Sequence, residues 1–207
     1  MKKRIIFLLL AAALLLCFCA CEKDRYLVET FDNYDLSAII KRYGGDLDSN
    51  FSVFPTKAVA GRAEVIDYRA SFLTVGFDTD GELFLDCVYS NEADYLAEIE
   101  RLSALSMTIS NRGEHYTNKV LYDDISYPYP AYITIDGFGN TYEYALLVAD
   151  KQEIIYLYLA YPGEEQFSRY AGYIKKDRAA YKGDSFNCFS MYNHSFDGGR
   201  SYAEFDD

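Results

Sequence analysis

The stretch that decides the fold is ASFLTVGFDTDGELFLDCVY, residues 70–89. Apolar and polar side chains alternate along both of its arms, and a period of two is typical of β-strands. Between the arms, residues 78–81 read DTDG, a composition that favours a turn. On the second arm Leu83 and Cys87 share one face, whereas Glu82 lies on the other. We therefore predict a β-hairpin with one face in a hydrophobic core and the other partly in water.

Helical spacing of apolar residues occurs at three places outside this hairpin. Asp35 can cap a short first helix. Residues 91–105 carry an apolar stripe that includes Leu96. Residues 163–176 follow Pro162, begin with acidic residues and end with lysines, which is the charge order that a helix dipole favours. We predict a helix in each of the three segments.

The second half of the chain repeats the element order of the first. A shift of 72 residues places residues 72–102 on residues 144–174 without a gap, hairpin on hairpin and helix on helix. The identity is low, so duplication and coincidence both remain open. The predicted fold class is α+β, an antiparallel sheet with helices packed on one face. Its two similar hairpin–helix halves span about residues 63–106 and 131–178.

The segment before the body has the pattern of an export signal. Three basic residues at positions 2–4 precede an apolar run that ends at Ala20 and is short for a transmembrane helix. The residues Phe18-Cys19-Ala20-Cys21 resemble the lipobox of bacterial lipoproteins, although Phe18 and Cys19 depart from its usual Leu and Ala or Ser. The resemblance covers only about the first 21 residues. It implies cleavage before Cys21 and a lipid on that cysteine.

These features divide the chain into three parts. We expect a lipoprotein signal peptide at residues 1–20, a tether at residues 21–33 and a single α+β domain at residues 34–207. The lipobox resemblance implies a secreted protein that is held on the extracytoplasmic face of the cell membrane through the lipid on Cys21.

The charge of the chain excludes some partners. Counted from Cys21, it has 17 basic and 32 acidic residues, a net charge of −15. Nucleic acids and anionic lipid surfaces attract clusters of Lys and Arg, so we expect no nucleic-acid partner and no electrostatic adhesion to lipid. Cationic partners and divalent metal ions are compatible with this charge.

Tyrosine is unusually frequent, with 21 Tyr and no Trp. A sheet-rich fold explains this composition, and so does an aromatic surface that binds a protein or a glycan. Tyr127, Tyr129 and Tyr132, which flank two prolines, are the candidate ligand-facing rings, although packing explains them equally well.

No local motif indicates catalysis. The two histidines, His115 and His194, lie in no recognised catalytic frame, and the spacing Asp78-x-Asp80 suits a turn better than a calcium loop. We therefore assign no catalytic residue, no metal ligand and no cofactor. The leading hypothesis is a non-catalytic binding or interaction module of the cell envelope. The alternative is a surface hydrolase built from scattered carboxylates such as Asp86 and Glu92, which a pocket holding two carboxylates would favour.

Two cysteines remain in the body, Cys87 and Cys188. Cys87 shares its strand face with Leu83 and Leu85, which indicates a small apolar core position. Cys188 lies in residues 185–192, a predicted edge strand, and no signal places it opposite Cys87. We predict a buried, unreactive thiol at Cys87 and no disulfide.

Overall fold

The computed structural model describes residues 23–44, 49–75, 78–111, 114–175, 189–192, 195–196 and 200–201. The predicted signal peptide at residues 1–20 lies outside the described residues, as do Cys21, Cys188 and His194. None of the helices within the described ranges combines the length and the apolar character that a bilayer span requires.

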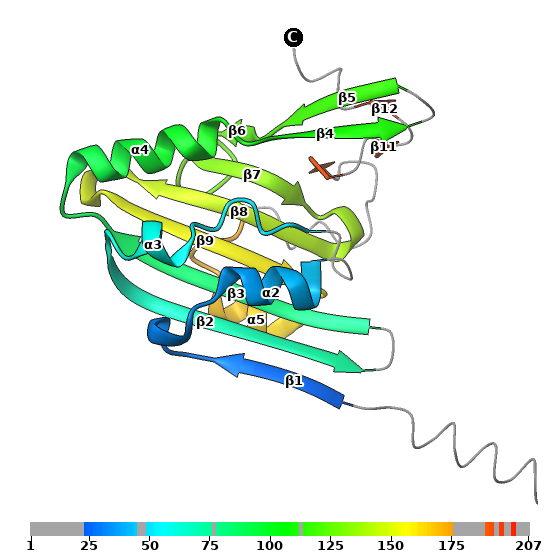
Figure 1. Cartoon of the computed structure of the whole chain (residues 1–207), viewed down its shortest axis with the longest axis horizontal. Coiled ribbons are helices and arrows are strands. Elements are labelled where there is room, and N and C mark those ends of the chain that lie inside the picture. Colours follow the sequence, from blue (N-terminus) through cyan, green and yellow to red (C-terminus); the bar gives the residue numbers. More distant parts are fainter. Residues whose placement is uncertain are drawn as a thin grey trace, which may run out of the picture.

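The fold is centred on one eight-stranded antiparallel sheet (Figure 1). Its strands follow the order β1 (Lys23–Val28), β2 (Glu64–Val75), β3 (Asp78–Val88), β9 (Glu153–Ala160), β8 (Thr141–Val148), β7 (Ala131–Asp136) and β10 (Phe189–Ser190), with β6 (Leu121–Asp123) also paired to β7. Two separate hairpins are formed by β4 (Ser106–Asn111) with β5 (Glu114–Lys119), and by β11 (Ser195–Phe196) with β12 (Arg200–Ser201). The prediction of an α+β fold with an antiparallel sheet is confirmed.

The helices are short, except for one. They are α2 (Leu36–Ile39), which continues into a π-turn at Ile40–Gly44, α3 (Lys57–Ala60), α4 (Glu92–Ser103) and α5 (Glu164–Arg169). Single 3-10 turns occur at Phe31–Asn33, Phe138–Asn140 and Ala149–Lys151. Asp35 accepts a hydrogen bond from the backbone N–H of Ala38, and Asn91 accepts one from that of Ala93. The first two predicted helices therefore begin where their capping residues indicate.

Both faces of the central strands are buried. The strand β9 reads EIIYLYLA, and a strand that is apolar at nearly every position has to bury both of its faces. Ile154, Tyr156 and Tyr158 join a core that α2, α3 and α4 cover, and we call this side of the sheet the α4 face. Ile155 and Leu157 join a second core that packs against α5, on what we call the α5 face. Figure 1 shows α2, α3 and α4 in front of the sheet and α5 behind it.

The prediction that the helices pack on one face is therefore wrong. The physical reason lies in the pairing of β3 with β9, where Leu83 stands opposite Tyr158 and both join the α4-face core. The 72-residue shift instead matches Leu83 with Ile155, which lies three residues from Tyr158 and points to the α5 face. Both hairpin–helix units exist, but the ungapped shift matches residues on opposite faces.

The predicted tether at residues 21–33 is also corrected. Residues 23–28 form the edge strand β1, which pairs with β2 from Lys23 opposite Val75 to Val28 opposite Ala70. Tyr26 and Val28 pack against the α4-face core. The strand forms because β2 supplies its hydrogen bonds, so a short segment needs little periodicity of its own.

The turn predicted at residues 78–81 lies elsewhere. Pairing of β2 with β3 continues to Val75 opposite Asp78, so residues 78–81 belong to β3. Gly81 is required there for a different reason, since a Cβ atom at this position would lie 2.7 Å from the Phe72 ring. The glycine makes room for an aromatic ring across the ladder.

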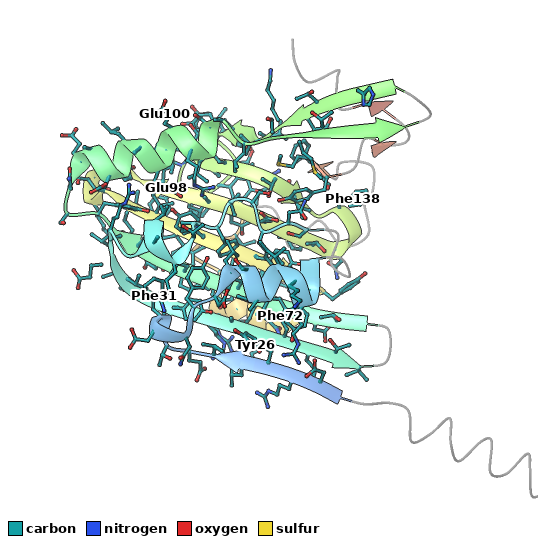
Figure 2. The ribbon with its side chains drawn as sticks, in the orientation of Figure 1. Tyr26, Phe31, Phe72, Glu98, Glu100 and Phe138 are labelled. Atoms are coloured by element: carbon teal, nitrogen blue, oxygen red, sulfur yellow. The ribbon has the colours of Figure 1, made fainter. Side chains whose placement is uncertain are left out.

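The buried side of α4 also differs from the predicted stripe. Leu96 is 53% exposed, whereas Tyr95, Glu98 and Leu102 are buried. Figure 2 shows Glu98 on the side of α4 that faces the sheet and Glu100 on the opposite side. A charged residue thus occupies a core-facing position of this helix.

The prediction for Cys87 is confirmed in its main part. The residue is a fully buried free thiol on β3, and burial raises the pKa of that thiol. A buried thiol with a raised pKa is unreactive, because the thiolate is the nucleophile.

Candidate ligand-binding pocket

A pocket of about 530 Å³ lies on the α5 face, between residues of β2, β3, α5 and the turn that follows α5. It is lined by Glu29, Ile66, Asp67, Tyr68, Arg69, Phe84, Asp86, Arg169, Tyr170 and Tyr173. Charged groups of both signs and aromatic rings therefore share one cavity, whose size suits a small ligand.

The β2–β3 ladder sets the order of these groups. Asp67 stands opposite Asp86, Arg69 opposite Phe84, and Ser71 opposite Glu82. Residues directly opposite each other in an antiparallel pair share a face, so each rung presents two side chains to the pocket side. An irregularity in the register between Val65 and Asp67 leaves Ile66 unpaired at the mouth of the pocket.

One end of the pocket is a pair of arginines held by a buried carboxylate. Glu82 is only 3% exposed, and it accepts a hydrogen bond from Nε of Arg69. Nη1 of Arg169 donates to both carboxylate oxygens of Glu82, at 2.7 and 2.8 Å. Glu82 thereby joins a guanidinium group of β2 to one of α5 in a fixed arrangement.

The outer partners of the two arginines are exposed. Arg69 also pairs with Glu29, and Arg169 pairs with Glu165 at 2.6 Å. The side chains of Glu29 and Glu165 are 56% and 80% exposed. Ion pairs of this kind are weak, because water screens them. A ligand anion could therefore replace both outer partners.

The other end of the pocket is acidic. Asp86 is 7% exposed and forms a hydrogen bond with Glu153. The pKa of Asp86 is raised to about 7, first by burial and then by the neighbouring charges of Glu153 and Asp67, while the charge of Lys151 acts in the opposite direction. The Oδ1 atom of Asp86 has no hydrogen-bond partner among the residues that the structure describes. Asp86 is thus a buried carboxyl group that exchanges its proton near neutral pH and has one unsatisfied oxygen.

An aromatic wall connects the two ends. The Phe84 ring centroid lies 5.1 Å from that of Tyr170 and 5.6 Å from that of Tyr173, with interplanar angles of 30° and 31°. The guanidinium carbon of Arg169 lies 6.0 Å from the Tyr170 ring centroid. These rings give the pocket an apolar surface beside its charged groups.

The structure does not bring the predicted tyrosines together. Tyr127 is buried in the α5-face core against Tyr144, with their ring centroids 4.9 Å apart, and Tyr129 packs against the same core. Tyr132 packs on the α4 face and contacts Tyr122. The sheet separates these rings, because Tyr132 lies on β7 with its side chain on the α4 face, whereas Tyr127 and Tyr129 pack on the α5 face. They form no common ligand surface.

The two carboxylates of the alternative hydrolase are likewise separated. Glu92 is exposed in the first turn of α4, on the face opposite to that of Asp86. The residue that does meet Asp86 in a pocket is Asp67, from the neighbouring strand. Within the described ranges, no cluster of three or more His, Cys, Asp or Glu residues is arranged to hold a metal ion.

Sequence reasoning missed Asp67, Arg69, Glu82 and Arg169 as site residues. A usable signal was present in the alternation of β2, because it places Asp67 and Arg69 on the same face of the sheet as Glu82 and Asp86. That face was expected to be partly in water, but Glu82 and Asp86 are buried. The position of Arg169 depends on the packing of α5 and could not be read from local spacing.

Comparisons with protein families, with curated proteins and with solved structures find no match to this chain. The geometry of the pocket is therefore the basis for its function.

Proposed function

We propose that the chain is a membrane-anchored lipoprotein of the cell envelope that binds a small ligand in the pocket between β2, β3 and α5 without chemically changing it. The observation that carries this proposal is the arginine pair, since buried Glu82 fixes Arg69 and Arg169 while their outer partners stay exposed. Preorganised side chains with replaceable partners are favourable for binding, because little ordering is needed when the ligand arrives.

The lipobox resemblance supports the anchor, and the position of β1 determines how far the anchor lies from the sheet. Only Glu22 separates Cys21 from Lys23, where the sheet begins. An extended chain spans at most about 3.6 Å per residue, so a lipid on Cys21 would hold the start of β1 within about 7 Å of the modified residue. Glu29 at the pocket follows the far end of β1, about 20 Å from Lys23 at the usual strand rise. In this arrangement the pocket lies about 20 Å along β1 from the anchored end of the strand.

The binding function is tested with the full-length lipidated protein in detergent micelles. Tyrosine fluorescence reports thermal unfolding, and the protein is screened with amino acids, peptides, sugars and phosphorylated compounds. A true ligand raises Tm in proportion to its binding, and Arg169→Gln abolishes that shift. Arg42→Gln, which removes a guanidinium paired with Asp24 outside the pocket, keeps it. The proposal fails if no class of compound changes Tm, or if the shift is the same in Arg169→Gln.

One observation favours hydrolysis as a second candidate function. Asp67 and Asp86 are directly opposite each other in the pocket, and Asp86 has a pKa of about 7 through burial. A carboxyl group with a raised pKa that faces a second carboxyl group is an arrangement that glycoside hydrolysis uses. Release of nitrophenol from nitrophenyl glycosides, lost in both Asp67→Asn and Asp86→Asn, would support it. Hydrolysis at the buffer rate by the wild-type protein would contradict it for those substrates.

A further inference from the structure

The two charged ends of the pocket have a fixed order and spacing. Asp67 and Arg69 are two residues apart on one face of β2, so their Cα atoms are about 7 Å apart, and the Arg69 side chain extends further along the strand to Glu82 on the next rung. On β3 the same spacing of two residues separates Asp86 from Phe84. A ligand lying along these strands would therefore meet carboxylates first and a guanidinium group one rung further on.

The arginine end has two guanidinium groups and three carboxylates, and it becomes positive towards the ligand when the two exposed carboxylates turn away. Arg69 and Arg169 share a single buried carboxylate, that of Glu82. Their other partners are Glu29 and Glu165, whose side chains are exposed and can turn into water. A guanidinium group presents parallel N–H donors that match a carboxylate. The chemistry of this end fits a carboxylate on the ligand.

Among the described residues, no basic side chain forms an ion pair with Asp86 or Asp67 at the acidic end. Asp86 faces Asp67 from β2, Glu153 from β9 and Tyr173 from the segment after α5, and Lys151 is the basic group that opposes them. The Lys151 side chain is itself 61% exposed and pairs with Glu153 at 3.4 Å. An ammonium group can donate to the unsatisfied Oδ1 of Asp86 and to Asp67. The proton now held by Asp86 would leave to solvent as the ammonium group binds.

We infer that the ligand of this pocket is a short zwitterionic peptide, with its terminal ammonium group at Asp67 and Asp86 and its terminal carboxylate at Arg69 and Arg169. This inference rests on the proposed binding function. The spacing sets a minimum length: an extended dipeptide places its two terminal charges about 7 Å apart and is the shortest peptide that reaches both ends. A single amino acid carries both charges on one carbon and is too short. An aromatic side chain of the peptide would pack against Phe84 and Tyr173.

The test uses the full-length lipidated protein in micelles and four probes in calorimetric titrations. The probes are the dipeptide Ala-Phe, its N-acetyl derivative, its C-terminal amide and free phenylalanine. We expect Ala-Phe to bind at least about tenfold more tightly than each of the other three, since each lacks one charge or the spacing. Asp67→Asn removes the discrimination against the acetylated peptide, and Arg169→Gln removes the discrimination against the amide.

Proton release gives a readout that a merely structural role would not change. At pH 6.5, titrations in buffers of different ionisation enthalpy should show a fraction of a proton released per Ala-Phe bound by the wild-type protein. Asp86→Asn should release none, whereas Asp80→Asn, an exposed position on the same strand outside the pocket, should behave as wild type. If binding weakens equally for all four probes in every variant, the inference that the ligand is zwitterionic is overturned.

The outcomes also separate this inference from the function on which it rests. If Ala-Phe fails to bind while another class of compound raises Tm in an Arg169-dependent manner, the peptide is wrong and the binding function stands. If no compound binds, both are overturned.

Discussion

Replacing Asp86 with Asn should make the protein more stable at alkaline pH. In the folded protein burial raises the pKa of Asp86 to about 7 from the ordinary value of 3.8. The folded state therefore keeps a proton that the unfolded chain loses, so stability falls as the pH rises through this window. Each pKa unit corresponds to 1.36 kcal/mol, which gives an upper limit of about 4 kcal/mol between the two values. Solvent that enters the pocket will reduce this figure to about 1–3 kcal/mol.

Asparagine is the informative replacement because it has the shape of a protonated aspartic acid. Its amide group can donate to Glu153 as the Asp86 carboxyl does, but it cannot ionise. Urea unfolding at pH 5 and pH 8, followed by circular dichroism, gives the free energy of unfolding of each protein. Because pH 5 already lies above 3.8, we expect Asp86→Asn to have some advantage over wild type at pH 5, and that advantage to grow by about 1–2 kcal/mol at pH 8.

One further variant in the same series separates this effect from a change in net charge. Asp80→Asn changes the net charge equally at an exposed position on the same strand, and should follow wild type. Glu143, whose pKa is also raised by burial, contributes the same pH dependence to all three proteins and cancels in the comparison. Parallel pH dependence of wild type and Asp86→Asn would refute the reasoning, and an equal gain in Asp80→Asn would assign it to net charge.

Three other predictions concern the anchor, the buried thiol and a glycine. Cys21→Ser should move the protein from the membrane to the soluble fraction, and an unchanged membrane-bound form in this variant would rule out the lipid on Cys21. Iodoacetamide should modify Cys87 only in denaturant and without added reductant, because the thiol is buried and free; modification of the native protein, or a need for reductant, would contradict this. Gly81→Ala should lower the free energy of unfolding by about 1–3 kcal/mol, because its Cβ would meet the Phe72 ring; an unchanged urea midpoint would show that the ring moves aside freely.

The sequence predicted those elements whose signals are local. The hairpin of β2 and β3, the start of α4 at Asn91 and the burial of Cys87 each depend on residues a few positions apart. Such patterns are set by backbone geometry and by the burial of one face, so they survive without knowledge of distant neighbours. β4 and β5 were not recognised, since polar and apolar residues are mixed along Ser106–Lys119.

The buried carboxylates show why the rest was not predictable. Glu98 is 2% exposed, and it accepts hydrogen bonds from Nε of Arg101 at 3.0 Å and from the Tyr156 hydroxyl at 2.9 Å. Arg101 also donates to the backbone carbonyl groups of Ser52 and Val53, so the network spans three distant segments. A glutamate in a helix reads as a solvated position, and only tertiary partners make its burial favourable.

A second buried carboxylate holds the same loop. Glu143 is fully buried, and it accepts hydrogen bonds from the Ser49 hydroxyl, from the backbone N–H of Val53 at 3.1 Å and from the Tyr192 hydroxyl at 3.0 Å. Phe51, between these contacts, has a positive φ of 50° and inserts its ring against Tyr158. Two carboxylates thus fix the segment that crosses the α4 face: one comes from the sheet, Glu143, and the other comes from α4, Glu98, which acts through Arg101.

The two faces of the sheet therefore differ in how their buried carboxylates are satisfied. On the α4 face Glu98 and Glu143 have partners on both oxygens, and on the α5 face Glu82 has the two arginines. Asp86 differs from these three, because its Oδ1 atom has no partner among the described residues. Leaving a buried acceptor unsatisfied costs about 1–3 kcal/mol, a cost that a ligand donor at this position would remove. This is the physical reason to place the ligand beside Asp86 and not in the more aromatic interior of the α4 face.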